Sequence, residues 1–144
     1  MTVHIERIKR LFPKDVCEKM LDIPTGFGTC AYNSARAVLD NMNSYDIAYC
    51  EGWLNGCMGH AFNKLVDENG REHYFDISQE YIKAKGGKKG GLQDVELEKE
   101  LPIQFVTNTF DEDGVAHLIS VPAWKGQHTY AQLKEKGLED MFFD

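Results

Sequence analysis

The chain has 144 residues, of which 42% are hydrophobic and 27% charged, and its formal net charge at pH 7 is −7. This length can bury one sizeable hydrophobic core but is too short for two ordinary domains, so residues 1–144 are predicted to form a single domain. The negative charge argues against nonspecific binding to nucleic acid or to an anionic membrane, because both require a basic surface.

The N-terminal residues mix charged and apolar side chains, and nowhere does the sequence contain a run of about 18 apolar residues. We therefore expect no signal sequence, no membrane-spanning helix and a cytoplasmic location. Four cysteines in such a chain are more consistent with free thiols, metal ligands or a nucleophile than with disulfide bonds.

The first part of the chain predicts two amphipathic helices. Apolar residues recur at helical spacing between Val3 and Leu11, and Pro13 suits the first turn of a second helix that runs to Leu21. Cys17 falls on the apolar side of that second pattern and is interpreted as a small core residue.

A cysteine opens the next predicted helix. The loop Asp22–Thr29, which contains proline and glycine, leads to apolar helical spacing that starts at Cys30 and ends near residues 41–43. Free N–H groups and the positive end of the helix dipole favour a thiolate at such a position, which lowers the pKa of the cysteine and makes it a nucleophile near neutral pH. A buried structural cysteine is the alternative interpretation.

Three strands are predicted after this helix, at Tyr45–Trp53, Gly59–Val66 and Arg71–Ser78, because these segments are rich in β-branched and aromatic residues. The last two are joined by the turn Asp67–Gly70. A two-residue hairpin centred on Asn-Gly would place His60 and Asp76 on opposite faces of the sheet.

A bulged turn gives the other register. If a type I turn is followed by Gly70 in a left-handed conformation, residue 67 pairs with residue 71, position 62 faces Asp76, and His60 shares a face with Asp76. Aspartate at the first position and glycine at the fourth are typical of a type I turn. We therefore predict the bulged turn, with His60 and Asp76 as diagonal neighbours.

The rest of the chain predicts a basic, glycine-rich loop over residues 79–91, a helical turn at Glu96–Glu100, strands at Pro102–Thr107 and Val115–Val121, and a helix at His128–Leu138. The loop lacks the spacing of a phosphate-binding loop. The predicted fold class is α+β, with N-terminal helices packed on an antiparallel sheet.

Four short motifs resemble, in order, the core of the transglutaminase-like superfamily: Gly28-Thr29-Cys30 at a helix start, the strand ending in Gly52-Trp53, Gly59-His60-Ala61-Phe62-Asn63, and Tyr74-Phe75-Asp76-Ile77-Ser78. The resemblance implies a papain-like α+β core. It also implies that Cys30 attacks a carbonyl carbon, that His60 acts as base and then as acid, and that Asp76 orients the imidazole.

Members of this superfamily include peptidases, amidases, deamidating or amide-forming transglutaminases, acyltransferases and proteins that have lost activity. The resemblance thus implies a thioester on Cys30, formed from the amide or ester of a protein or peptide substrate without a cofactor or metal, and resolved by water or an amine. The sequence departs from the family at Ala31, Phe62 and Lys64, where many relatives carry Trp, Trp and an acidic residue. These differences leave the substrate unassigned.

The backbone N–H of Cys30 is a natural donor to the oxyanion, since it lies at a helix N-terminus. Tyr32, Asn33 and Trp53 are candidates for a second donor, and Glu51 is a candidate substrate contact. An aromatic side chain at such positions more often serves packing. An exposed carboxylate at a strand end is the alternative interpretation of Glu51.

Two other functions are compatible with the sequence. Cys50, Cys57 and His60, with His73 on a neighbouring strand, offer thiolates and imidazoles to zinc, although their spacing lacks the paired knuckle of common zinc modules. A catalytically silent protein that keeps the fold and modulates another protein is the second alternative.

Overall fold

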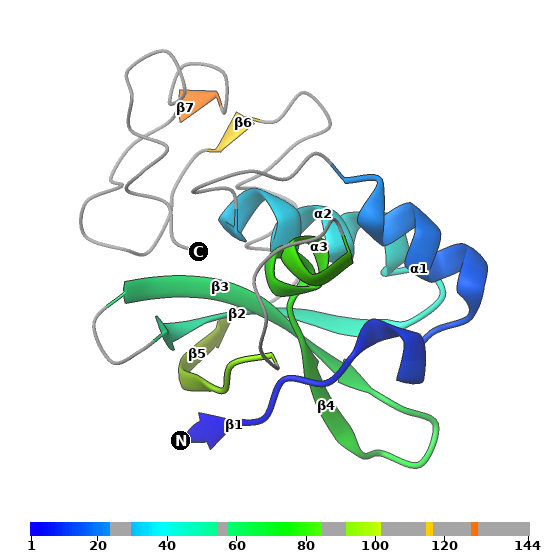
Figure 1. Cartoon of the computed structure of the whole chain (residues 1–144), viewed down its shortest axis with the longest axis horizontal. Coiled ribbons are helices and arrows are strands. Elements are labelled where there is room, and N and C mark those ends of the chain that lie inside the picture. Colours follow the sequence, from blue (N-terminus) through cyan, green and yellow to red (C-terminus); the bar gives the residue numbers. More distant parts are fainter. Residues whose placement is uncertain (24–29, 55–57, 85–91, 102–114, 117–127, 130–144) are drawn as a thin grey trace.

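The computed structural model describes residues 1–23, 30–54, 58–84, 92–101, 115–116 and 128–129. Within this part the chain is an α+β protein, as predicted, in which helices cover one face of an antiparallel five-stranded sheet (Figure 1). The helices are the short 3-10 helix η1 (Ile8–Arg10), α1 (Lys14–Leu21), α2 (Cys30–Asn41) and α3 (Ile77–Ala84). The predictions for α1 and α2 are confirmed.

The sheet is formed by β1 (Thr2–Val3), β2 (Asp46–Leu54), β3 (Met58–Val66), β4 (Glu72–Phe75) and β5 (Val95–Leu101), in the order β1-β5-β2-β3-β4. All four neighbouring pairs are antiparallel. A separate pair joins β6 (Val115–Ala116) to β7 (His128–Thr129).

The helix predicted over Val3–Leu11 is wrong for the first residues, which are extended, and only the single 3-10 turn Ile8–Arg10 lies within that range. β1 pairs with β5 at one edge of the sheet, and Ile5 then forms a parallel bridge to Tyr74 of β4 at the other edge. The N–H of Glu6 donates to the carbonyl of Tyr74 at 2.8 Å. Val3 and Ile5 are both buried two residues apart, which is strand periodicity. The segment therefore nearly closes the sheet.

β5 replaces the helical turn predicted at Glu96–Glu100. Its pairing with β2 shifts register between Glu51 and Gly52, and this bulge changes which face its residues occupy. Leu97 packs into one core cluster and Leu101 into the other, although both have the same parity in the sequence. Glycine is required at position 52, because a Cβ there would lie 1.8 Å from the carbonyl oxygen of Glu96.

Two hydrophobic clusters lie on opposite faces of the sheet. The larger one, between helices and sheet, includes Tyr49, Ala61, Leu65 and Phe75 together with apolar residues of α1 and α2. The smaller one is formed by Val3, Ile5, Cys50, Leu54, Phe62, Tyr74 and Val95. Odd-numbered residues of β3 thus face the helices, and even-numbered residues face the smaller cluster.

Several predicted elements lie wholly or partly outside the described residues: loop residues 85–91, strand residues 102–107 and 117–121, and helix residues 130–138. His128 and Thr129 form β7, where a helix was expected to begin. In the ranges given above, no helix is long and apolar enough to cross a membrane.

Candidate functional site

The turn between β3 and β4 is the bulged turn predicted from the sequence. Gly70 has φ of 80°, its N–H donates to the carbonyl of Asp67 at 3.0 Å, and the N–H of Asp67 donates to the carbonyl of Arg71 at 2.9 Å. The pairing continues from Val66 opposite Glu72 to Asn63 opposite Phe75. This register places position 62 against Asp76.

Asp76 lies at a boundary that the sequence analysis misplaced. The strand predicted to reach Ser78 ends at Phe75, and Asp76 caps helix α3, which occupies the first part of the predicted 79–91 loop. Its carbonyl accepts the N–H of Glu80 at 3.0 Å, and its Oδ1 accepts the N–H of Gln79 at 3.3 Å. The sequence carried a signal for this helix, since Asp-x-x-Gln at 76–79 is typical of a helix start.

His60 and Asp76 form a buried hydrogen-bonded pair. Nε2 of His60 bonds to Oδ2 of Asp76, and their side chains are 0% and 1% exposed. The imidazole stacks near the ring of Phe62 in the smaller cluster, with 6.4 Å between ring centroids. The two side chains therefore occupy the same face of the sheet.

Cys30 approaches this pair around the edge of β3. The last residue pair between β3 and β4 is Asn63 with Phe75, so the N–H of Ala61 lies beyond the end of β4. It donates instead to Sγ of Cys30 at 3.5 Å. Cys30 is fully buried as the first residue of α2.

The imidazole of His60 also interacts with the Cys30 thiol. Nδ1 has no partner that meets hydrogen-bond geometry within the described structure, yet Cys30 and His60 alter each other's proton affinity through charge and hydrogen bonding. This interaction is therefore not a standard hydrogen bond. The imidazole lies between Cys30 and Asp76.

Burial dominates the proton affinity of the thiol. Desolvation raises the pKa of Cys30 although His60 and the Ala61 N–H oppose it, so the thiolate expected from the helix N-terminus alone is not favoured in this closed site. Burial lowers the pKa of His60, but the charge of Asp76 and, when Cys30 is ionised, the charge of its thiolate raise that pKa well above the ordinary value of 6.5. Because Cys30 and His60 each alter the pKa of the other, the two groups titrate as a coupled pair.

Gln79 was missed by the sequence analysis, which placed it in a loop. Its Nε2 donates to Oδ2 of Asp76 at 2.9 Å and to the carbonyl of Gln93 at 3.1 Å. Its Oε1 accepts the N–H of Gln93 at 2.6 Å. One amide thus joins Asp76 to the chain segment that enters β5.

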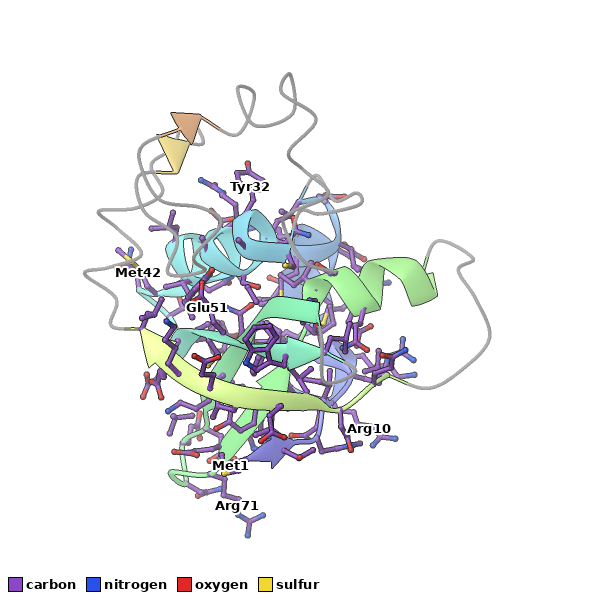
Figure 2. The ribbon with its side chains drawn as sticks, turned by 90° about the vertical axis from the view of Figure 1, so that its left-hand side faces the viewer. Met1, Arg10, Tyr32, Met42, Glu51 and Arg71 are labelled. Carbon is purple, nitrogen blue, oxygen red and sulfur yellow. The ribbon has the colours of Figure 1, made fainter. Side chains whose placement is uncertain are left out.

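Two of the candidate oxyanion donors lie on α2. Asn33, one turn after Cys30, donates from Nδ2 to Oγ of Ser78 at 3.1 Å and so connects α2 to α3. Tyr32 lies on the outer side of α2 (Figure 2). It lines a cavity of about 840 Å³ between α1 and α2, to which Cys30, His60 and Asp76 do not contribute.

The two candidates on β2 occupy the face of the sheet that α2 covers. Glu51 is only 5% exposed. It accepts a hydrogen bond from the Tyr49 hydroxyl at 2.9 Å, lies 3.9 Å from Nζ of Lys99, and has its pKa raised by burial. The interpretation of Glu51 as an exposed strand-end carboxylate is therefore wrong. Trp53 is 40% exposed and donates from Nε1 to Glu98 at 2.6 Å.

Of the side chains that the sequence offered to zinc, Cys50, His60 and His73 belong to the described part of the chain. Cys57 lies outside the described residues. Elsewhere in the described ranges, no three His, Cys, Asp or Glu side chains gather as metal ligands. Nε2 of His60 is bonded to Asp76, and both ring nitrogens of His73 are bonded to carboxylates.

Comparisons of the chain with models of protein families, with curated proteins and with solved structures gave no match. The candidate site is therefore defined by its own geometry: a thiol at a helix start, a buried imidazole and a capped carboxylate.

Proposed function

We propose that this chain is a thiol-dependent acyl-transfer enzyme with a papain-like, transglutaminase-like core. The observation that supports this most strongly is the position of the His60 imidazole. One ring nitrogen bonds to Asp76, the other makes no standard hydrogen bond within the described residues, and the imidazole interacts with the Cys30 thiol at the start of a helix. These are the relations that a nucleophile, its base and an orienting carboxylate require.

In the proposed reaction, His60 takes the thiol proton as Sγ of Cys30 forms a bond to the carbonyl carbon of an amide or ester. The tetrahedral intermediate collapses when His60 returns that proton to the departing amine or alcohol, which leaves a thioester on Cys30. Water, or a second amine, then gives a proton to His60 and attacks the thioester. Collapse releases the acid or the new amide, and the proton returns to Sγ.

The oxyanion formed in each half of the reaction carries a negative charge near Cys30. The backbone N–H of Cys30 belongs to the first turn of a 12-residue helix, where free N–H groups and the helix dipole stabilise an anion. Asn33 is a weaker candidate for the second donor, because its amide already donates to Ser78.

A second function is favoured by one specific observation. Cys30, His60 and Asp76 are between 0% and 1% exposed, so a substrate carbonyl reaches Sγ only if the site opens. A protein that keeps the fold without catalysis, and modulates another protein, has no need for such an opening. The two functions therefore differ in whether the Cys30 thiol becomes reactive in the native protein.

The test is the pH dependence of alkylation by a small reagent, read residue by residue by mass spectrometry. In the opened site the imidazolium stabilises the thiolate, so Cys30 is expected to retain its alkylation rate below about pH 7. His60→Gln keeps an amide donor for Asp76 but has no base. In this variant, Cys30 should follow an ordinary thiol with a pKa of about 8.5 or above.

Cys17, a half-buried thiol outside the site, is the internal control. The alkylation rate of each cysteine at one pH is divided by the rate of the same cysteine at another pH. Differences in solvent access between Cys30 and Cys17 therefore cancel. A wild-type Cys30 profile that parallels the Cys17 profile would overturn the enzyme proposal. A Cys30 that is labelled only after unfolding would favour the non-catalytic binding protein.

A further inference from the structure

The side-chain amide of Gln79 contacts both Asp76 and the backbone of Gln93. Its oxygen accepts one bond from Gln93, and its nitrogen donates one bond to Gln93 and one to Asp76. Both amide protons and the amide oxygen are thus engaged. These three hydrogen bonds can all form in only one orientation of the amide group.

The backbone of Gln93 determines that orientation. If the Gln79 amide rotated by half a turn, its NH₂ group would face the N–H of Gln93, and its oxygen would face the Gln93 carbonyl and the Asp76 carboxylate. All three contacts would become repulsive. The amide nitrogen is therefore held toward Asp76 by a peptide unit 14 residues away in the sequence.

Gln79 also reaches both oxygens of the Asp76 carboxylate. Its side chain donates to Oδ2, the same oxygen that bonds to Nε2 of His60, and its backbone N–H donates to Oδ1. Two donors from one residue fix the plane of the carboxylate. Since the imidazole is oriented by its bond to Oδ2, the direction in which Nδ1 points depends on the same contacts.

We infer that Gln79 is a positioning residue, which locks the Asp76 carboxylate and, through it, the reactive orientation of His60, and that the backbone of Gln93 holds Gln79 in place. This inference rests on the proposed acyl-transfer function. It connects the site to the start of β5, because Gln93 lies two residues before Val95. A shift of that segment would release the amide and loosen the His60–Asp76 pair.

The central experiment compares Gln79→Met with Gln93→Ala. Gln79→Met keeps the length and volume of the side chain without its hydrogen bonds, whereas Gln93→Ala leaves the backbone groups that Gln79 uses. In Gln79→Met we expect the alkylation rate of Cys30 at about pH 6 to fall about tenfold, equivalent to one pKa unit. Gln93→Ala should retain the wild-type profile.

A double-mutant cycle separates positioning from general stabilisation. If Gln79 acts through Asp76, Gln79→Met should have no further effect on the Cys30 profile in an Asp76→Asn background. Equal effects of Gln79→Met in both backgrounds would overturn the inference. Gln79→Glu serves as a second variant of the same shape, and it places an oxygen against Asp76, so it should lower the rate at least as much.

An NMR measurement keeps the inference distinct from the proposed function. The proton on Nε2 of His60 is buried in its bond to Asp76 and should give a downfield resonance. That resonance should shift in Gln79→Met and stay in place in Gln93→Ala. A resonance unmoved by Gln79→Met refutes the positioning role, even in a protein whose Cys30 is reactive. An unreactive wild-type Cys30 refutes the proposed function, while the resonance still reports on Gln79.

Discussion

His60 and His73 stand on neighbouring strands, each between two partners, yet they are suited to different tasks. His60 is buried between Asp76 and the Cys30 thiol. His73 is 22% exposed and lies between two carboxylates, with Nδ1 2.8 Å from Glu6 and Nε2 2.9 Å from Asp67. Both have a raised pKa.

The difference lies in the second ring nitrogen. At His73 both ring nitrogens face carboxylate acceptors, so each can donate a hydrogen bond when the imidazole is protonated. The imidazolium thus connects the N-terminal segment to the β3–β4 turn. At His60 only one nitrogen faces a carboxylate, and under the proposed function the other exchanges a proton with the Cys30 thiol. A raised histidine pKa therefore indicates function only when the neighbour of the second nitrogen has a proton to give.

The largest expected effect of a substitution is at the buried pair. Asp76→Ala should lower the free energy of unfolding by about 3–5 kcal/mol, because it leaves a buried imidazole without its charged partner and removes the cap of α3. Urea unfolding of wild type and variant measures this loss. Asp67→Ala, which removes the carboxylate facing His73, is the matched change and should cost much less. Similar losses in the two variants would contradict the distinction between the two histidines.

The next largest losses of stability are expected at two glycines, one near each histidine. Gly52, opposite His60 in β2, has the carbonyl of Glu96 where a Cβ would lie, so Gly52→Ala should cost about 3 kcal/mol or displace β5. Gly70, in the turn before His73, has open space around it but a φ of +80°, so Gly70→Ala should cost only about 1–2 kcal/mol.

Thermal or urea unfolding ranks these two variants, and Gly70→Asn provides the control, since asparagine tolerates the left-handed conformation. We expect Gly70→Asn to recover much of the stability that Gly70→Ala loses. A Gly52→Ala protein as stable as wild type would show that β5 can move away from β2 at little cost.

The smallest effect is the pH-dependent contribution of His73. Hydrogen bonds to Asp67 and Glu6 raise its pKa in the folded protein, so its stabilisation is complete below its unfolded pKa of about 6.5 and is lost as pH rises through the folded pKa. His73→Gln should remove a stabilisation of less than about 1 kcal/mol. The difference in unfolding free energy between wild type and variant should therefore shrink above neutral pH. A difference that stays constant with pH would show that the imidazole is not charged in the fold.

Local sequence predicted the part of the site that local chemistry determines. The Asp67–Gly70 turn sets the register of β3 and β4 through residues within the turn itself, and Cys30 was correctly placed at a helix start. The shared face of His60 and Asp76 followed from the register that the turn sets.

The elements that were missed depend on distant partners. β5 has the acidic composition of a solvated helix, and it becomes a strand because β1 and β2 pair with its two sides. The apolar spacing of Ile5, Ile8 and Leu11 resembles a helix, but Ile5 is bound by Tyr74. Gln79 could not be recognised as part of the site, because its role depends on the backbone of Gln93 and on a helix start that was placed inside a strand.

The N-terminal segment has a consequence for self-association. An open sheet presents two edges whose unpaired N–H and C=O groups can recruit another chain. Here six residues touch both edges: β1 pairs with β5, and Ile5 and Glu6 bond to Tyr74 of β4. Removing residues 1–6 would expose backbone on two strands at once. The segment thus covers the backbone groups at both edges of the sheet. The first sign of its removal should be concentration-dependent association of the protein with itself.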